Sequence, residues 1–509
     1  MRFTQLVAVL FGHVAVAVAA APTVTIASGV VIGTTTSLPL ATVVVNKFLG
    51  IPFAASPPVR FSPPTVPAPF NEPYMATTIK DACIQQFSYP AASRNFSMAV
   101  FNNPGGPPPV ESEDCLYLNV FAPSTPAPAG GLAAYDGSSF AAFQDVIVVT
   151  HNYRTNIFGF SNSPQIPIDQ QNAGFYDQRM ALEWVQQNIA EFGGSPAKVT
   201  IFGQSAGGYS VKQLFAVPPK PLTFRAVIME SQAASLTGSG PANWETLVAA
   251  LGCTTATSQL ACVRAAPATS IKSIIEHAAL NFPPAVDGIT QSASVADAIT
   301  SHTAAQVPIF MGTNANEGRV FAAEDGLDQP TPPITTAEFL NLTFPGEPLI
   351  QDAILAAYPS SLIQQPYLAI SQIITDSTFT CPTSAFANTA AISGYDVWRY
   401  YFNASFPNTQ LFPDGGAYHS SEVPIVFGTY PAAGETNQEV GLSKFMQSTW
   451  AKFAKDPSGG PGWPALGAPL DVDLGDLGAD GSTGEVTIQQ ISVDYICLVY
   501  APLIAIEGL

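Results

Sequence analysis

The sequence is short of charged residues, and above all of positive ones. Charged side chains make up 11% of the 509 residues, with 18 Lys and Arg against 37 Asp and Glu, so the net charge is −19. An average soluble protein has about 25% charged residues. Nucleic acids and anionic membrane surfaces repel a chain with this balance, and we expect neither as a partner. The 47% of hydrophobic residues is ample for a sizeable core.

The sequence also lacks the closely spaced cysteine and histidine pairs that mark zinc sites. The acidic stretch 471–481 misses the glycine and late glutamate of a calcium loop, and we expect it to be a solvated loop. The sequence therefore predicts no metal site and no cofactor. An even number of cysteines predicts disulfides, and six cysteines allow fifteen pairings, among which spacing does not choose. The six are Cys83, Cys115, Cys253, Cys262, Cys381 and Cys497.

The chain begins with the pattern of a secretory signal. Arg2 precedes an apolar run over residues 6–20 that ends in small residues before Pro22. This pattern predicts a signal peptide over 1–20 and a mature domain over 21–509; a buried N-terminal helix is the alternative. The apolar tail 496–506 is short and contains Pro502, so no integral membrane association is expected. Three N-x-S/T sequons fit secretion: Asn95, Asn341 and Asn403.

Short apolar runs alternate with helical patterns along the chain. Buried strands are expected at 116–121, 146–150, 199–202, 226–230, 307–312 and 396–402, after a hairpin over 23–33. Helices are expected at 177–190, 205–215 and 442–453, and helical insertions at about 240–300 and 325–390. Strands that alternate with helices predict an α/β fold, with a mostly parallel sheet covered on both faces.

One serine has the surroundings of a nucleophile. The residues from Gly203 to Gly207, GQSAG, fit the pattern G-x-S-x-G between an expected strand and an expected helix. A sharp turn there projects Ser205 from the end of the strand, and small neighbours prevent clashes. The following helix N-terminus favours a developing oxyanion. The alternative is a glycine-rich turn in which Ser205 only caps the helix.

A nucleophilic serine needs a base, and the sequence has five histidines. His13 lies in the signal, His277 in an expected helix, and His302 at the amino end of a strand. His151 ends a strand but precedes the serine. His419 follows the last expected strand, and it alone is late enough for the chain order serine, acid, histidine. A histidine in a surface loop is the alternative.

Glu317 is the expected acid of this set. It follows the strand over 307–312 and precedes Gly318, so it lies near the carboxyl end of that strand. A carboxylate there would hold the imidazole in the required tautomer and stabilise its cation. Asp325 and Asp328 are competitors in a longer loop, and a solvated glutamate is the alternative.

Longer segments carry a distinctive pattern, namely FLGIPFA (48–54), SEDCLYLNVFAP (112–123), VTHNYRTNIFGF (149–160), AGFYDQRMALEWVQQNIAEFGGSP (173–196), GQSAGG (203–208), TNANEG (313–318) and AYHSSEVPIVFG (417–428). Together they resemble the type B carboxylesterase/lipase family, which includes cholinesterases and fungal extracellular lipases. The resemblance covers nearly the whole mature chain. It implies an α/β-hydrolase fold and a triad of Ser205, Glu317 and His419. It also implies the disulfides Cys83–Cys115 and Cys253–Cys262 and, from the cholinesterase pattern, Cys381–Cys497.

The sequence departs from the family pattern in two places. Gln204 replaces the glutamate common before the family's serine, which removes a carboxylate beside the nucleophile. Between residues 121 and 140 the family has an apolar strand and a glycine-rich turn of the oxyanion site. Here the chain reads FAPSTPAPAGGLAAYDGSSF, whose prolines would remove ladder donors from a central strand. Gly130 and Gly131 are interpreted as a linker rather than as remnants of the turn.

The missing strand would lie between those at 146–150 and 199–202. We therefore expect a hole in the centre of the sheet or a changed pairing, and each unpaired buried backbone group costs about 1–3 kcal/mol. The oxyanion site would keep only the Ala206 N–H, and each lost donor costs about 10²–10³ in turnover. Our hypothesis for the loss is a skipped exon or a faulty gene model, which sequencing the transcript would test.

Two functions fit these observations. The first is a secreted serine carboxylic ester hydrolase that forms an acyl-enzyme, acts on a small-molecule or lipid ester and is impaired by the missing segment. The second is an inactive family member that acts as a binding or adhesion module. The sequence does not choose among lipase, simple carboxylesterase, sterol esterase and feruloyl esterase activity, and it does not give the oligomeric state.

Overall fold

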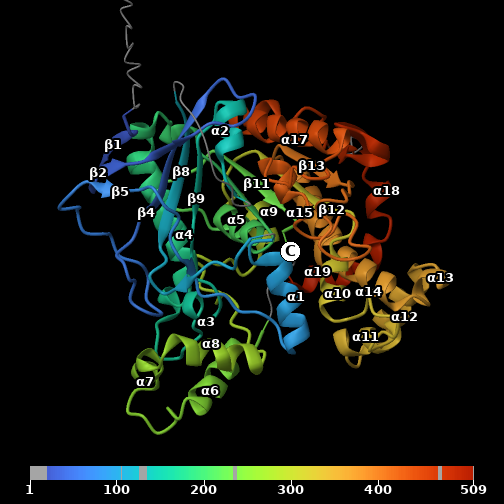
Figure 1. The fold of residues 1–509 in the computed structure, drawn as a ribbon. Coiled ribbons are helices and arrows are strands. Elements are labelled where there is room, and N and C mark those ends of the chain that lie inside the picture. The colour runs from blue at the N-terminus through green and yellow to red at the C-terminus, as the bar shows by residue number, and fades with distance from the viewer. Residues whose placement is uncertain (1–19, 105, 125–134, 233–237, 468–472, 508–509) are drawn as a thin grey trace, which may run out of the picture.

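The computed structural model describes residues 20–104, 106–124, 135–232, 238–467 and 473–507 (Figure 1). Almost all of the expected signal peptide, which ends at residue 20, lies outside these ranges. Gly130 and Gly131 also lie outside the described residues.

Two sheets form the centre of the molecule. The first has four antiparallel strands in the order β3-β4-β8-β9, namely β3 (Thr34–Thr36), β4 (Val44–Pro52), β8 (Tyr117–Ser124) and β9 (Val148–His151). The second has six strands in chain order, namely β10 (Thr200–Gln204), β11 (Ala226–Glu230), β12 (Ile309–Asn314), β13 (Val397–Phe402), β14 (Asp473–Leu477) and β15 (Glu485–Gln489). Its first five strands are parallel and β15 is antiparallel to β14.

The predicted hairpin forms at the N-terminal end of the described chain. Strands β1 (Thr23–Ile26) and β2 (Gly29–Ile32) pair antiparallel, and β5 (Tyr74–Met75) joins β2. Strands β6 (Ala82–Cys83) and β7 (Glu111–Ser112) make a small separate pair. The expectation of a solvated loop over 471–481 is wrong. Residues 473–477 form β14, which lies between β13 and β15 in the sheet, and most of them are buried.

Alternation along the strands divides the core between the two faces of the six-stranded sheet. Val227 and Met229 pack toward α5 (Ala206–Ala216), α9 (Val295–Thr300) and α15 (Cys381–Ile392). Ile228 belongs to the cluster that contains α16 (Val423–Phe427) and α17 (Asn437–Lys455). Side chains of successive strand residues point to opposite faces, so the apolar run of β11 is buried on both sides.

Further helices complete the covering layers. Helix α4 (Ala173–Asn188) packs Trp184 and Val185 against the four-stranded sheet. Other elements near the sheets are α1 (Ala91–Phe101), α2 (Ser138–Gln144), α3 (Asn156–Gly159), α10 (Gly318–Glu324), α18 (Ile491–Asp494) and α19 (Cys497–Glu507). No helix in the described ranges has the length and apolar character needed to cross a bilayer.

Two groups of helices protrude from the body of the molecule, as Figure 1 shows. The first is α6 (Gly240–Ala250), α7 (Gln259–Ala265) and α8 (Ala268–His277), and the second is α11 (Thr336–Thr343), α12 (Pro348–Ala357), α13 (Ser360–Ile363) and α14 (Pro366–Ile374). They occupy the regions expected to be helical insertions. A π-helix (Thr375–Thr380) joins α14 to α15.

The two sheets meet at the place where the sequence lacks a strand. Within the described chain, β9 is paired only with β8, and β10 only with β11. Aromatic side chains pack at this boundary: the ring of Phe427 stacks on Phe202 of β10 at 5.7 Å and meets Phe140 of α2 edge-on at 5.6 Å. One apolar cluster therefore spans both sheets although their hydrogen-bonded ladders are separate.

Candidate active site

Ser205 lies at a strained turn between β10 and α5. Its φ of 56° and ψ of −119° are unusual for a residue with a side chain. The neighbouring glycines make this turn possible, because a Cβ on Gly203 would come within 2.5 Å of the Gly207 backbone and one on Gly208 within 2.9 Å of the Glu230 carbonyl oxygen. The turn exposes Ser205 at the carboxyl end of its strand, which is the arrangement of a nucleophile elbow.

Glu317 and His419 form a buried pair beside this turn. Nδ1 of His419 lies 2.6 Å from a carboxylate oxygen of Glu317. The other oxygen of Glu317 accepts a 2.7 Å hydrogen bond from the backbone N–H of Asn314, at the end of β12. Both side chains are nearly inaccessible to solvent. Because the carboxylate is held at both oxygens, it fixes the orientation of the imidazole.

The second ring nitrogen of His419 faces Gln204 rather than Ser205. Nε2 of His419 lies 3.3 Å from the amide nitrogen of Gln204, the residue just before the serine. Among the described residues, the Ser205 hydroxyl has no hydrogen-bond partner within 3.5 Å. The structure thus brings His419 to the serine turn, without a hydrogen bond between the serine hydroxyl and the ring among the described residues. Such bonds are often long in proteins without substrate.

Two aromatic rings pack against the imidazole. The ring of Phe379 lies 4.7 Å from that of His419 and the ring of Phe321 lies 5.2 Å from it. Phe379 belongs to the π-helix, whose Thr375 hydroxyl accepts a hydrogen bond from the Gly318 N–H at 2.9 Å. The π-helix therefore contacts both the histidine and the chain next to Glu317.

Two further carboxyl groups are buried near the pair, and sequence reasoning did not find them. Burial raises the pKa of Glu422 well above its ordinary value, and the nearby Glu317 and Glu230 raise it further. Burial also raises the pKa of Glu230 to about 7, against a hydrogen bond from Trp450 that lowers it. The raised pKa favours the neutral form of Glu422 beside the Glu317 carboxylate. The side-chain amide of Asn314 donates to it.

The other histidines take no part in this arrangement. His277 is exposed at the end of α8, where its ring stacks on Tyr89. His302 is exposed before β12 and stacks on Tyr395. His151 ends β9 beside Phe53, and burial lowers its pKa. His13 lies outside the described residues.

The competing acids are also placed away from the histidine. Asp325 follows the last residue of α10 and is exposed. Asp328 accepts a hydrogen bond from its neighbour Gln329 in the turn beyond. Glu317, by contrast, precedes the first residue of α10, one helix length closer to β12. The helix separates the two aspartates from the ring.

The oxyanion side of the site is less complete in the described chain. Ala206 is the first residue of α5 and is exposed, and the N–H groups of a helix's first turn have no partner within the helix. The glycine pair that the sequence raised as a remnant of the family's turn lies outside the described residues.

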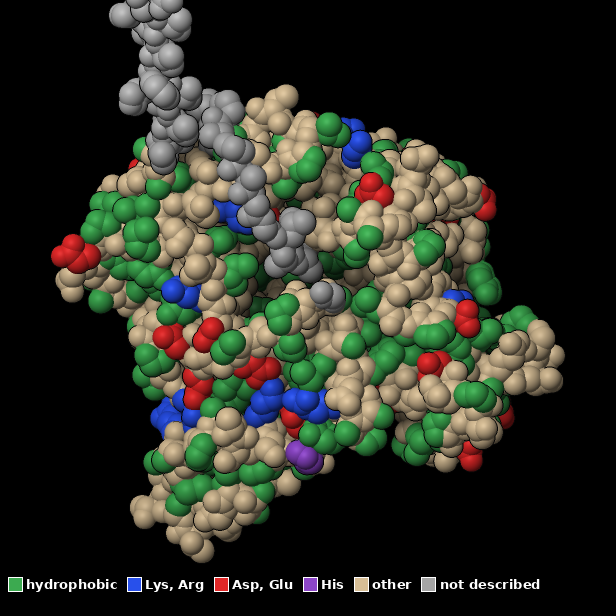
Figure 2. Space-filling model, viewed as in Figure 1, with side chains coloured by type: hydrophobic (Ala, Val, Ile, Leu, Met, Phe, Trp, Pro, Cys, Tyr) green, Lys and Arg blue, Asp and Glu red, His purple; other side chains and the backbone are tan. Residues whose placement is uncertain are grey.

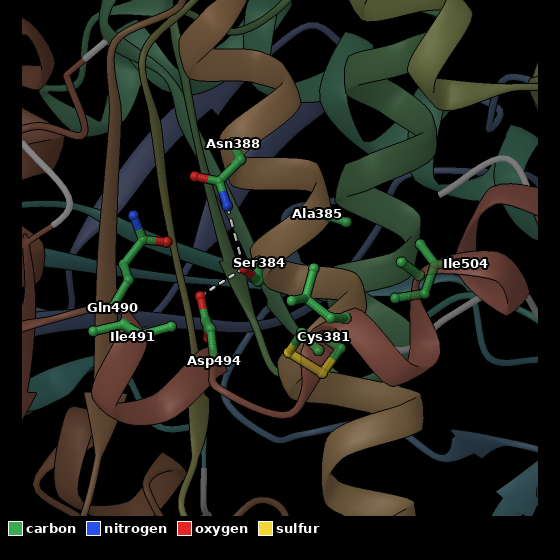
Figure 3. A pocket seen from close by; sticks show the side chains of 11 residues that line it. Cys381, Ser384, Ala385, Asn388, Gln490, Ile491, Asp494 and Ile504 are labelled. Atoms are coloured by element: carbon green, nitrogen blue, oxygen red, sulfur yellow. Dashed lines mark hydrogen bonds between the residues drawn. A yellow bond between two sulfur atoms is a disulfide. The ribbon is translucent and has the colours of Figure 1, made fainter. Parts of the chain in front are cut away.

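A cavity of about 540 Å³ lies elsewhere, between α15, α18 and α19. Figure 3 shows that its polar groups contact one another: Asn388 donates to the Ser384 hydroxyl, which donates to Asp494. Asp494 also pairs with Arg399 at 2.6 Å. The Ser384 hydroxyl therefore bonds to a carboxylate that Arg399 already pairs, and no histidine is among the described residues that line this cavity.

The cysteines are joined as the resemblance implies. Disulfides connect Cys83 with Cys115, Cys253 with Cys262, and Cys381 with Cys497. The asparagines of the three sequons, Asn95, Asn341 and Asn403, are all exposed. In the part of the chain that is described, no group of three or more His, Cys, Asp or Glu side chains could hold a metal ion.

The surface reflects the low content of charged residues. Figure 2 shows widely spaced charged side chains on a mostly uncharged face, with Lys and Arg next to Asp and Glu in one group. Ion pairs of this kind link Lys272 with Glu111 and Arg94 with Glu276. These cations therefore lie beside carboxylates.

Comparison with known proteins gives a consistent result. The model of the Carboxylesterase family matches residues 20–469. The chain is 34% identical to the para-nitrobenzyl esterase of Bacillus subtilis (strain 168) over 464 residues, 84% of this chain and 88% of that protein. It is 30% identical to the chlorogenic acid esterase of Aspergillus niger over 460 residues, 83% and 81% of the two chains.

A relative from animals matches over a similar length. The chain is 32% identical to the cholinesterase of Mus musculus over 505 aligned residues, which cover 84% of this chain and 79% of that protein. The family model and the relatives each match most of the sequence, and the range that the family model matches includes β10, β12 and the loop that carries His419. The chain belongs to the carboxylesterase family, has its α/β-hydrolase fold and is a carboxylic ester hydrolase.

Proposed function

We propose that the protein is a secreted serine esterase whose catalytic residues are Ser205, Glu317 and His419. The observation that carries this proposal is the buried 2.6 Å contact between Glu317 and His419 directly beside the strained turn at Ser205. A structural ion pair would not need a strained serine next to it. An ordinary helix cap would not need a buried histidine on a carboxylate.

The geometry supports a two-step acyl transfer. Glu317 accepts a hydrogen bond from Nδ1–H of His419, which leaves Nε2 with a free electron pair. Nε2 takes the proton of Ser205 as its oxygen attacks the ester carbonyl, and the resulting imidazolium protonates the leaving alcohol. Water then attacks the acyl-serine, His419 takes the water's proton, and the acid leaves as Ser205 regains its hydrogen.

The oxyanion of each step needs donors. The Ala206 N–H at the start of α5 supplies one, with the positive end of the helix dipole behind it. We propose that the absence of the family's strand and glycine turn lowers turnover. Loss of one donor costs about 10²–10³ in turnover.

The substrate class follows from the relatives. Para-nitrobenzyl and chlorogenic acid esters are the substrates named for two of them, and we propose a small-molecule or lipid carboxylic ester for this chain. We propose that residues 1–20 are a secretory signal, that 21–509 form one domain and that the exposed Asn95, Asn341 and Asn403 carry glycans. Three disulfides support an oxidising, extracellular location.

The test is turnover of p-nitrophenyl butyrate by the purified protein and by Ser205→Ala. We expect measurable turnover and phosphonylation of Ser205 by an organophosphate, both lost in the variant. Ser273→Ala, at an exposed position on α8, is the matched control and should retain both. A folded wild-type protein with neither turnover nor labelling would instead support the inactive binding module, and activity that persists in Ser205→Ala would refute the assigned nucleophile.

A further inference from the structure

The side-chain amide of Gln204 occupies the place beside Nε2 of His419 from which Ser205 would donate its proton. Its amide nitrogen lies 3.3 Å from Nε2 of His419. The opposite nitrogen, Nδ1, is 2.6 Å from the Glu317 carboxylate. The ring is thus contacted at both nitrogens by neighbouring residues, and the serine is the group left without a bond among the described residues.

The chemistry of the ring decides which way these bonds run. A carboxylate only accepts, so Nδ1 must carry the hydrogen that bonds to Glu317. In the neutral imidazole, Nε2 then has the free electron pair and can only accept. The NH₂ group of Gln204 is therefore the donor. That electron pair is the one that takes the proton from Ser205 in the proposed mechanism.

We infer that Gln204 is a positioning residue that caps the base in the resting enzyme. This inference rests on the proposed function of the triad. Gln204 holds neutral His419 beside the serine turn and must release Nε2 before Ser205 can transfer its proton. Gln204 and Ser205 are adjacent in the chain at the end of β10, so the exchange of one donor for the other takes place between neighbouring residues.

The identity of the side chain matters because an amide and a carboxylate act in opposite ways. The NH₂ group of a glutamine stabilises the neutral ring, whereas a glutamate at this position could only accept, and would stabilise the imidazolium. Gln204 therefore favours the neutral base, whereas the family's usual glutamate would favour its cation. We expect this difference to appear in the acid limb of the profile of kcat/KM against pH.

Other charged groups near the ring are few and come from three elements. Glu317 before α10 contacts it directly, and Glu422, next to α16, lies behind Asn314. Glu230 at the end of β11 is bonded to Trp450. From the π-helix the ring meets Phe379, while Asp376 of that helix points to Tyr358. None of these groups contacts Nε2, so changes at position 204 can be separated from them.

The experiment compares Gln204→Met and Gln204→Glu with wild type in kcat/KM against pH, using p-nitrophenyl butyrate. Gln204→Met removes the competing donor at similar volume, so kcat/KM on the plateau should rise about 2–10-fold and the acid limb should move up by about 0.4–1 pH unit. Gln204→Glu should move the acid limb up by about 1 pH unit or more. Gln351→Met, a half-buried glutamine on α12, is the matched control.

A second readout does not depend on turnover. In protein labelled with ¹⁵N-histidine, the midpoint at which the His419 ring gains its second proton should rise in the order wild type, Gln204→Met, Gln204→Glu. An unchanged midpoint in both variants, with each folded as judged by near-UV circular dichroism, would overturn the role of Gln204. Loss of the proposed function would be seen separately, as turnover that survives Ser205→Ala.

Discussion

The two halves of the active site differ in how completely the chain builds them. The acid–base half comes from β12, α10 and the loop after β13, where every strand has its neighbours and Glu317 meets His419 at 2.6 Å in a buried setting. The nucleophile half rests on β10, which forms the edge of its sheet, opposite β9, which forms the edge of the other. The strands of the acid–base half are paired on both sides, whereas the strand of the nucleophile half lies at the boundary between the two sheets.

This contrast shows that the proposed nucleophile can be well placed while its surroundings are incomplete. The strain at Ser205 is held by close glycine contacts within β10 and α5 and by a backbone hydrogen bond from Ser205 to Glu230 in β11. None of these contacts involves β9. Apart from the Ala206 N–H, the oxyanion donors that the family pattern implies come from outside the elbow, from the segment that this chain lacks.

The largest expected effect is on the complete half. Glu317→Gln keeps the size of the side chain but removes the charge that selects the Nδ1–H tautomer, so kcat should fall by about 10⁴ with little change in KM. Steady-state kinetics on p-nitrophenyl butyrate measure this. A loss below tenfold would mean that Glu317 is a structural partner of His419 only. Asp328→Asn, at the rejected acid, is the control and should leave kcat unchanged.

Restoring the incomplete half should give the next largest effect. Replacing residues 122–134 by the corresponding segment of the Bacillus subtilis para-nitrobenzyl esterase would supply an apolar strand and glycine donors. Turnover should rise by at least about 10², the contribution of one oxyanion donor. A chimaera that folds but gains nothing would show that the oxyanion site of this chain is already complete, and the contrast between the halves would disappear.

Packing across the boundary can be tested with Phe427. Its buried ring touches Phe202 of β10 and Phe140 of α2, so Phe427→Ala should lower the free energy of unfolding by about 3–5 kcal/mol. Phe453→Ala, in the same core but beneath the intact sheet against Phe310, should cost a similar amount. Urea denaturation of both variants gives the comparison. A cost below about 1 kcal/mol for Phe427→Ala alone would mean that its ring does not hold the two sheets together.

The smallest expected effect is a pH dependence of stability from Glu230. Burial raises its pKa to about 7 in the folded protein, above its ordinary 4.5. A raised folded-state value means that stability falls as pH rises from about 4.5 to 7 and is level above that range. Glu230→Gln keeps an acceptor for Trp450 and should be more stable than wild type at pH 8 by about 3 kcal/mol.

Urea unfolding at pH 5 and pH 8 measures this difference. At pH 5 most of this difference should be gone, because Glu230 is then protonated in the folded protein. Glu245→Gln, at an exposed position on α6, is the matched control and should show no gain at pH 8. Equal effects of the two substitutions would show that Glu230 is not desolvated.

Local patterns predicted most of the strands and the main helices of the body. The apolar runs of β11 to β13 are buried on both faces, and such runs are readable because parallel strands carry few polar residues. The pattern failed at β14, whose aspartates suggested a loop. Asp476 is buried there by pairing with neighbouring strands that are distant in sequence, and no local rule detects such pairing.

The candidate site was partly visible in the same way. The G-x-S-x-G turn marks Ser205 because only small residues fit a turn this sharp, and chain order selected His419 among five histidines. The contacts of Gln204 with His419 and of Phe379 with the ring left no local signal, because 215 and 40 residues separate those partners. Glu422, three residues after His419, likewise shows its importance only through its burial beside Glu230.

The amino-acid sequence by itself determined the strand–turn–helix at Ser205, the absence of an apolar segment before Tyr135 and the scarcity of charge. Each is a property of residues close together in the chain, where backbone sterics and composition act directly. Only the tertiary structure decided that the imidazole rests on Gln204, that Glu422 and Glu230 lose their water, and that the sheet divides between β9 and β10. Those outcomes depend on which segments, distant in the sequence, pack together and exclude water from the groups between them.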